Sequence, residues 1–124
     1  MQDIQHRQDI ESLVDTFYGL ARTDDLLGPV FFGALGTGDW SHHLEVVSNF
    51  WATVLLGERS YPGGFMWKHL RLPLRTEHVD RWAETFTALV QKSYAGPVAD
   101  EALRRVAIMA EVLKTKITQR TIIQ

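Results

Sequence analysis

The chain has 124 residues, of which 45% are hydrophobic and 23% charged, a balance typical of one globular domain over residues 1–124. A formal net charge of −2 disfavours nucleic acid and anionic membranes as partners. The absence of cysteine excludes disulfide bonds, iron–sulfur clusters and cysteine-ligated metals. No apolar run reaches the roughly 18 residues of a membrane span, and the polar N-terminus is unlike a signal peptide, so we expect a cytoplasmic protein.

Helical periodicity dominates the first third of the chain. A first helix is predicted from one apolar stripe, made of Ile10, Leu13, Val14, Phe17 and Ala21. We expect Asp3 or Asp9 to cap its start and the segment Thr23-Asp24-Asp25 to end it. A short helical turn should follow, beginning at Pro29 and carrying Val30, Phe31, Phe32 and Leu35.

A longer helix is expected between Asp39, as its N-cap, and Gly57, as its C-terminus. Its apolar face consists of Leu44, Val47, Phe50, Trp51, Val54 and Leu55. His43 and Val47 are four residues apart and therefore lie on the same face of the helix. His42 is rotated by about 100° from His43, so we expect it to point outward.

The second half of the chain also predicts helices. A loop rich in turn residues (58–64) leads to a short helix around His69, which must stop before Pro73. Thr76 should cap a long helix that ends before Gly96-Pro97, and a last helix follows. The last helix carries the stripe Leu103, Val106, Ala110, Leu113 and Ile117. Only the tail at residues 121–123 is strand-like, so the fold class is all-α.

His69 is the most informative single residue. It lies among large apolar side chains (Phe65, Met66, Trp67, Leu70, Leu72), an environment that suits a neutral imidazole bound to haem iron. A lone histidine is also compatible with a partly buried place in the core.

Aromatic residues are spread over five different segments, namely Phe17, Tyr18, Phe31, Phe50, Trp51, Trp67 and Trp82. Each of them alone is best explained as core. Together they would also line a cavity for a flat macrocycle. Tyr18, His43 and Trp82 each bring a hydrogen-bonding group toward the same interior.

A set of motifs, taken in chain order, resembles the truncated haemoglobins of group III. The motifs are Phe17-Tyr18, Leu27-Gly28-Pro29-Val30-Phe31, Trp40, His43, Asn49-Phe50-Trp51, Leu55-Leu56-Gly57-Glu58, Lys68-His69-Leu70-Arg71-Leu72-Pro73 and Trp82. They cover roughly the first two thirds of the chain. The resemblance implies a truncated, 2-over-2 globin fold around a haem pocket.

The resemblance also implies the site. His69 would be the proximal ligand of the iron, and Tyr18, His43 and Trp82 would face the ligand on the distal side. Residues contacting haem b would be Phe17, Phe31, Val47, Phe50, Trp51, Met66, His69 and Leu72. Val47 stands where the family commonly has a larger aliphatic residue, which would make the distal cavity roomier.

The implied function is binding of small ligands (dioxygen, nitric oxide, carbon monoxide or cyanide) at a five-coordinate iron. Two hydrogen-bond donors on the distal side favour redox chemistry or detoxification of reactive oxygen and nitrogen species, with nitric oxide dioxygenase- or peroxidase-like activity possible. The chain has no flavin or nicotinamide motif, so electrons would come from a separate reductase.

Two other interpretations remain open. One is a cofactor-free helical interaction or regulatory module whose aromatic residues are only core. A histidine–carboxylate metal site is disfavoured, because His78 and Asp80 diverge at the start of a helix and no closely spaced His or Glu pair faces inward.

Overall fold

The computed structural model describes residues 1–61, 63 and 72–123, with side chains as far as residue 119. The described residues form helices and connecting loops, without a strand. The helices are α1 (Arg7–Thr23), α2 (Leu27–Leu35), α3 (Ser41–Leu56), α5 (Thr76–Ser93) and α6 (Pro97–Ile123). The short helix predicted around His69 falls outside the described residues. The all-α prediction is confirmed, and α6 continues to Ile123 through the tail whose residue types are strand-like.

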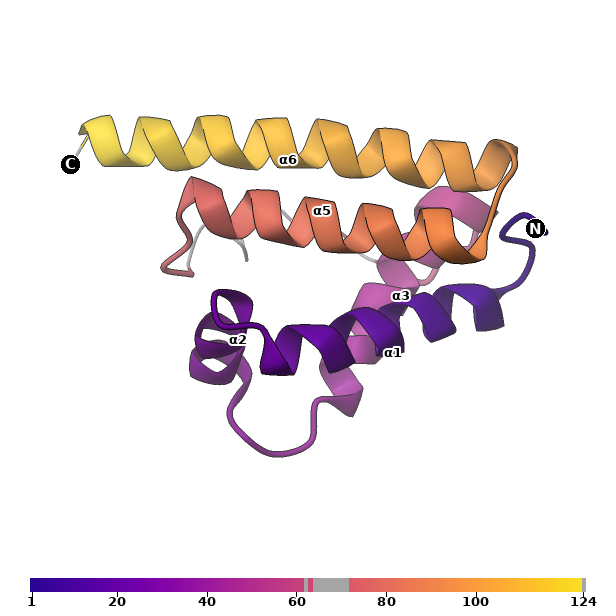
Figure 1. Ribbon diagram of the computed structural model, residues 1–124, viewed down its shortest axis with the longest axis horizontal. Helices are drawn as coiled ribbons and strands as arrows, with labels where there is room; N and C mark the ends of the chain where they lie inside the picture. Colours follow the sequence, from indigo (N-terminus) through magenta and orange to yellow (C-terminus); the bar gives the residue numbers. More distant parts are fainter. Residues whose placement is uncertain (62, 64–71, 124) are drawn as a thin grey trace.

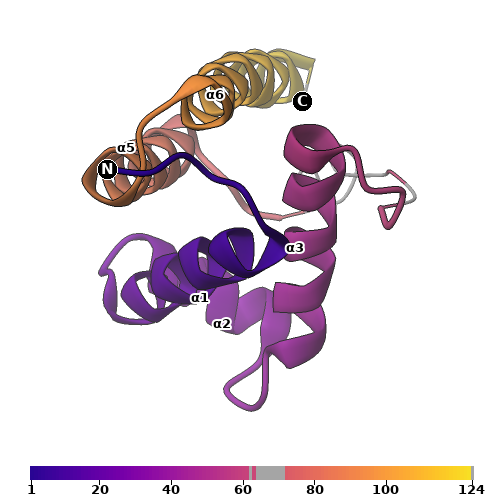
Figure 2. The ribbon, with the colours of Figure 1, turned by 90° about the vertical axis from the view of Figure 1, so that its right-hand side faces the viewer.

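Two pairs of helices make up most of the fold (Figures 1 and 2). The antiparallel helices α5 and α6 lie side by side, and α3 crosses α1. The short helix α2 sits at the end of α1 and also packs against α5. Among the described residues, no helix is long and apolar enough to cross a membrane.

The apolar stripes of the helices meet in the core as their spacing predicts. All five stripe residues of α1 are buried, and they pack with residues of α3, α5 and α6 in one cluster. Trp51 of α3 stacks on Phe86 of α5, with ring centroids 5.0 Å apart and planes 11° from parallel. A smaller cluster joins Val79 of α5 to Ala110, Leu113 and Ile117 of α6.

The start of α1 is capped by only one of the two aspartates that the sequence suggested. Asp9 accepts hydrogen bonds from the backbone N–H groups of Gln5 and His6. Asp3 instead accepts from the N–H groups of Val98 and Ala99, at the first turn of α6. Asp3 therefore fastens the N-terminal segment to a helix about 95 residues away in sequence.

Gly96 allows this close approach of the N-terminal segment to α6. Its φ is +145°, and a Cβ at this position would lie only 2.5 Å from Cγ of Asp3. A side chain at position 96 would collide with the capping carboxylate, so glycine is required there.

Three other helix starts differ from the sequence expectation. Helix α2 begins at Leu27 rather than Pro29, because Asp24 accepts from the N–H groups of Leu26 and Leu27. Helix α3 has Trp40 as its N-cap, and Asp39 accepts instead from both the N–H and the hydroxyl of Ser41. Helix α5 has Arg75 rather than Thr76 as its N-cap, because the Arg75 N–H donates to Nδ1 of His78.

The predicted end of α3 is confirmed. Gly57 follows the last helical residue with φ +75°, the left-handed conformation that commonly ends a helix. The chain turns there into the loop that carries Glu58, Ser60 and Tyr61.

Candidate ligand-binding cavity

A cavity of about 350 Å3 lies between α2, α3 and α5, beside the middle of α1. Eight of the residues that the sequence predicted for a site line this cavity, namely Tyr18, Phe31, His43, Val47, Phe50, Trp51, Leu72 and Trp82. They come from four helices and from the segment just before α5. The fold thus gathers these residues around one space.

Tyr18 and His43 are hydrogen-bonded to each other at the cavity wall. The Tyr18 hydroxyl lies 2.9 Å from Nε2 of His43, and the direction of this bond depends on the tautomer of the imidazole. Tyr18 is buried, and burial raises the pKa of its hydroxyl above the ordinary value. The hydroxyl therefore stays protonated near neutral pH and keeps its ability to donate a hydrogen bond.

Tyr18 is held in place by aromatic neighbours. Its ring makes edge-to-face contacts with Phe31 and His43, with ring centroids 5.2 Å away in each case. Phe17 lies behind it in the core, where its ring contacts Tyr18 and Phe86 edge-on. These contacts limit the motion of the Tyr18 ring, so its hydroxyl is positioned before any ligand enters.

Two polar residues that the sequence analysis did not assign to the site also line the cavity. His42 is exposed, as expected for an outward side chain, yet it lies along the same cavity as His43. Tyr61 packs edge-to-face on Phe50 at 5.3 Å, and partial burial raises the pKa of its hydroxyl. Tyr61 stands in a loop, where no periodic pattern signals which way a side chain faces.

A second, smaller cavity of about 50 Å3 shares Tyr18, Phe31, Leu72 and Trp82 with the larger one. Its other walls include His78 and Val79 of α5 and Leu113 of α6. His78 is buried, and burial lowers the pKa of its imidazole. A neutral His78 fits its observed hydrogen bond, because Nδ1 accepts from the Arg75 N–H at 2.9 Å.

The chemistry of the large cavity suits a flat, mostly apolar guest. Aromatic and aliphatic side chains form most of its walls, and Tyr18, His43 and Trp82 supply polar atoms among them. Within the described part of the chain, no three His, Asp or Glu side chains gather as a metal site. Met66 and His69, which the sequence also assigned to the site, lie outside the described residues.

These features define an all-helical protein with an aromatic cavity, and comparisons with known proteins specify the family. The chain is 35% identical over 108 residues to a group 3 truncated hemoglobin of Campylobacter jejuni, covering 85% of each protein. The crystal structure of a group III truncated hemoglobin from Campylobacter jejuni matches with a TM-score of 0.86 and 32% identity. That match covers 94% of this chain and 95% of the crystallised one. No protein-family model matches the chain.

The chain belongs to the group 3 truncated haemoglobin family. The family resemblance and the truncated globin fold predicted from the sequence are both confirmed. The similarity also extends beyond the first two thirds of the chain, where the motifs lie, because the structural match covers nearly the whole length.

Proposed function

We propose that the large cavity binds haem b and that the bound iron takes up small diatomic ligands. The observation that carries this proposal is the Tyr18–His43 hydrogen bond at the wall of a 350 Å3 aromatic cavity. A polar pair of this kind, with Tyr18 buried and His43 half-buried, adds little to a purely structural core, but it is useful where a polar ligand must be recognised.

Apolar side chains would hold the macrocycle. Phe31, Val47, Phe50 and Trp51 present hydrocarbon surface to the cavity from α2 and α3, and Leu72 does so from the segment before α5. We assign Met66 to the same wall and His69 to the iron, on the sequence motif alone. When bound, haem supplies an iron atom that binds diatomic molecules and exchanges electrons.

Tyr18, His43 and Trp82 would govern the distal side. The protonated hydroxyl of Tyr18 and the indole N–H of Trp82 are hydrogen-bond donors, and the indole N–H cannot accept. A hydrogen bond to a charge-bearing acceptor contributes about 1.5–3 kcal/mol. Each donor that reaches the ligand would therefore slow its release by roughly tenfold or more.

Slow ligand release favours reaction over transport. We infer redox chemistry or detoxification of reactive oxygen and nitrogen species, with nitric oxide dioxygenase- or peroxidase-like turnover as the specific activities to assay. Dioxygen and nitric oxide are the substrates in this proposal, and carbon monoxide and cyanide are useful probe ligands. A separate reductase would return the iron to the ferrous state.

Absorption spectra of the purified protein and of two variants test the assignment of the iron ligand. The wild type should show a Soret band, with a five-coordinate ferrous spectrum and a distinct carbon monoxide complex. His69→Ala should lose its haem, or regain the five-coordinate spectrum when imidazole is added. His78→Ala removes another imidazole beside the cavities and should keep the wild-type spectrum. If His78→Ala alone abolishes the Soret band, His69 is not the iron ligand.

A further inference from the structure

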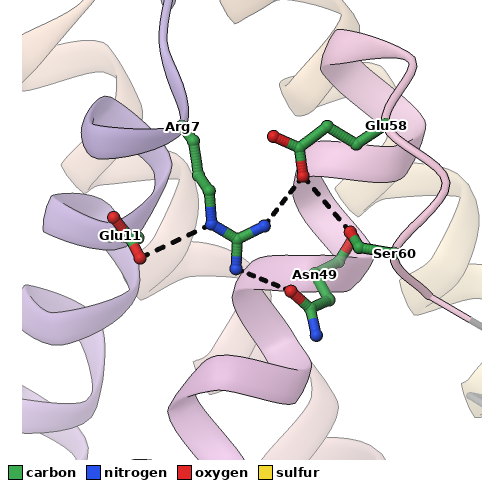
Figure 3. Close-up of polar contacts among 5 residues, drawn as sticks. All are labelled: Arg7, Glu11, Asn49, Glu58 and Ser60. Carbon is green, nitrogen blue, oxygen red and sulfur yellow. Dashed lines mark hydrogen bonds and ion pairs between the residues drawn. The ribbon is translucent and has the colours of Figure 1, made fainter.

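Arg7 ties the start of α1 to the middle of α3 and to the loop that follows α3 (Figure 3). Its Nη1 donates to Oε2 of Glu58 at 2.8 Å, and its Nη2 donates to Oδ1 of Asn49 at 2.6 Å. The Ser60 hydroxyl donates to the same Glu58 oxygen at 3.2 Å. One guanidinium thus joins two segments that are 42 and 51 residues away in sequence.

This network is partly shielded from solvent. The side chains of Arg7 and Glu58 are only 30% and 35% exposed. An ion pair with this burial, and with two separate acceptors on one planar guanidinium, restrains its partners better than a fully exposed pair. Glu11, which is more exposed, completes the network at 3.5 Å from Nε of Arg7.

Two residues of this network, Asn49 and Ser60, are each followed in the sequence by a residue that lines the large cavity. Phe50 follows Asn49 and Tyr61 follows Ser60, and both Phe50 and Tyr61 belong to the cavity wall. Their rings pack edge-to-face with centroids 5.3 Å apart. The polar network therefore holds the two residues that directly precede these aromatic rings in the sequence.

Arg7 is not needed to start α1. Asp9 accepts from the N–H groups of Gln5 and His6, which caps the helix without the guanidinium. The side chain of Arg7 instead donates short hydrogen bonds to Asn49 of α3 and to Glu58 in the loop. Arg7 therefore links α1 to α3 and to the loop, rather than acting within its own helix.

We propose that Arg7 is a positioning residue for the cavity: through Glu58 and Asn49 it keeps Tyr61 packed against Phe50 in the cavity wall. Loss of this restraint frees the loop at residues 58–61 and opens that side of the cavity. The consequence for haem retention rests on the haem-binding function proposed above.

Fluorine NMR of protein labelled with 3-fluorotyrosine tests the positioning directly. The chain has three tyrosines, and Tyr61→Phe identifies the signal of Tyr61. Arg7→Gln should move the Tyr61 signal toward that of an exposed tyrosine and leave the Tyr18 signal in place. Arg7→Lys, which keeps the charge, should restore part of the shift. Arg104→Gln is the matched control, because it removes an arginine that pairs with Glu101 on α6. An unchanged Tyr61 signal in Arg7→Gln would overturn the proposal.

Transfer of haem to an excess of apomyoglobin measures the consequence. Arg7→Gln should release haem roughly three- to tenfold faster than wild type and Arg104→Gln, the range expected for one partly buried ion pair. In a Tyr61→Ala background the same substitution should change the rate little, because the residue through which Arg7 acts is gone. Equal acceleration in both backgrounds would show that Arg7 acts on general stability alone and would overturn the proposal. A wild type without any haem would remove the proposed function, whereas the fluorine signals would still test the positioning.

Discussion

The Tyr18 hydroxyl and Nε2 of His43 lie 2.9 Å apart, although the two residues belong to different helices, α1 and α3. The crossing of these helices brings them together, and α1 and α3 pack against each other along the core. In the proposed function, a ligand entering the cavity would therefore meet a coupled pair rather than two independent side chains. Breaking or keeping this bond would change which polar atoms face the ligand.

Protonation of His43 should alter ligand entry. A neutral Nε2 can accept a hydrogen bond from Tyr18, whereas an imidazolium cannot accept and is poorly held among apolar walls. We expect the association rate of carbon monoxide to change between about pH 5 and 8, where histidines titrate. His43→Leu should flatten this dependence. Identical pH profiles for the two proteins would exclude His43 as the titrating group.

Substitution of the distal donors should speed ligand release. Tyr18→Phe and Trp82→Phe each remove one donor, and we expect each to raise the oxygen dissociation rate by roughly tenfold or more. The double variant should deviate from additivity, since both groups act on one small ligand. Stopped-flow traces with unchanged rates in both single variants would show that neither donor reaches the ligand.

Asp24 should contribute measurably to stability. One of its carboxylate oxygens accepts the N–H groups of Leu26 and Leu27, and the other accepts from Nη1 of Arg81 at 2.7 Å. Loss of such a cap costs about 0.5–2 kcal/mol, so Asp24→Ala should lower the free energy of unfolding by that amount. Asp15→Ala, at an exposed position in the middle of α1, is the control for denaturant titrations and should change it much less.

His78 should make the protein less stable in mild acid. Burial lowers the pKa of His78 in the folded chain below the ordinary value of 6.5. Between the two pKa values the unfolded chain binds more protons than the folded one, so stability rises with pH. The stability that neutral His78 contributes is fully present above about pH 6.5. It is lost as the pH falls through the pKa of His78 in the folded chain. In denaturant titrations across this range, His78→Asn should show a flatter dependence than wild type. Parallel curves would mean that another group causes the acid sensitivity.

Local sequence patterns predicted the helices well, because each helix buries one stripe of its own residues. Ile10, Val14 and Val106 illustrate this, since all three are buried where their spacing placed them. Helix caps were predicted less well. Asp3 has the residue type of a cap, but its partners on α6 are brought to it only by the folded chain.

The residues of the candidate site likewise divide into those that local patterns could predict and those that depend on the folded chain. Tyr18, His43 and Trp82 stand on periodic helices, so their direction could be predicted, and they line the cavity. Tyr61 stands in a loop, and its place depends on contacts with Phe50 and on the network around Arg7. His69 carries the strongest sequence motif, and its role stays a prediction because it lies outside the described residues.

Haem titration of a variant with a filled cavity tests the central claim most directly. Val47→Trp would place an indole inside the large cavity, whereas Val112→Trp adds the same side chain at an exposed position on α6. Circular dichroism would establish that both variants remain helical. We predict that wild type and Val112→Trp bind haem stoichiometrically with a sharp Soret band, and that Val47→Trp binds it weakly or not at all. A wild type that binds no haem, or a helical Val47→Trp that binds it as tightly as wild type, would contradict the assignment of this cavity to haem.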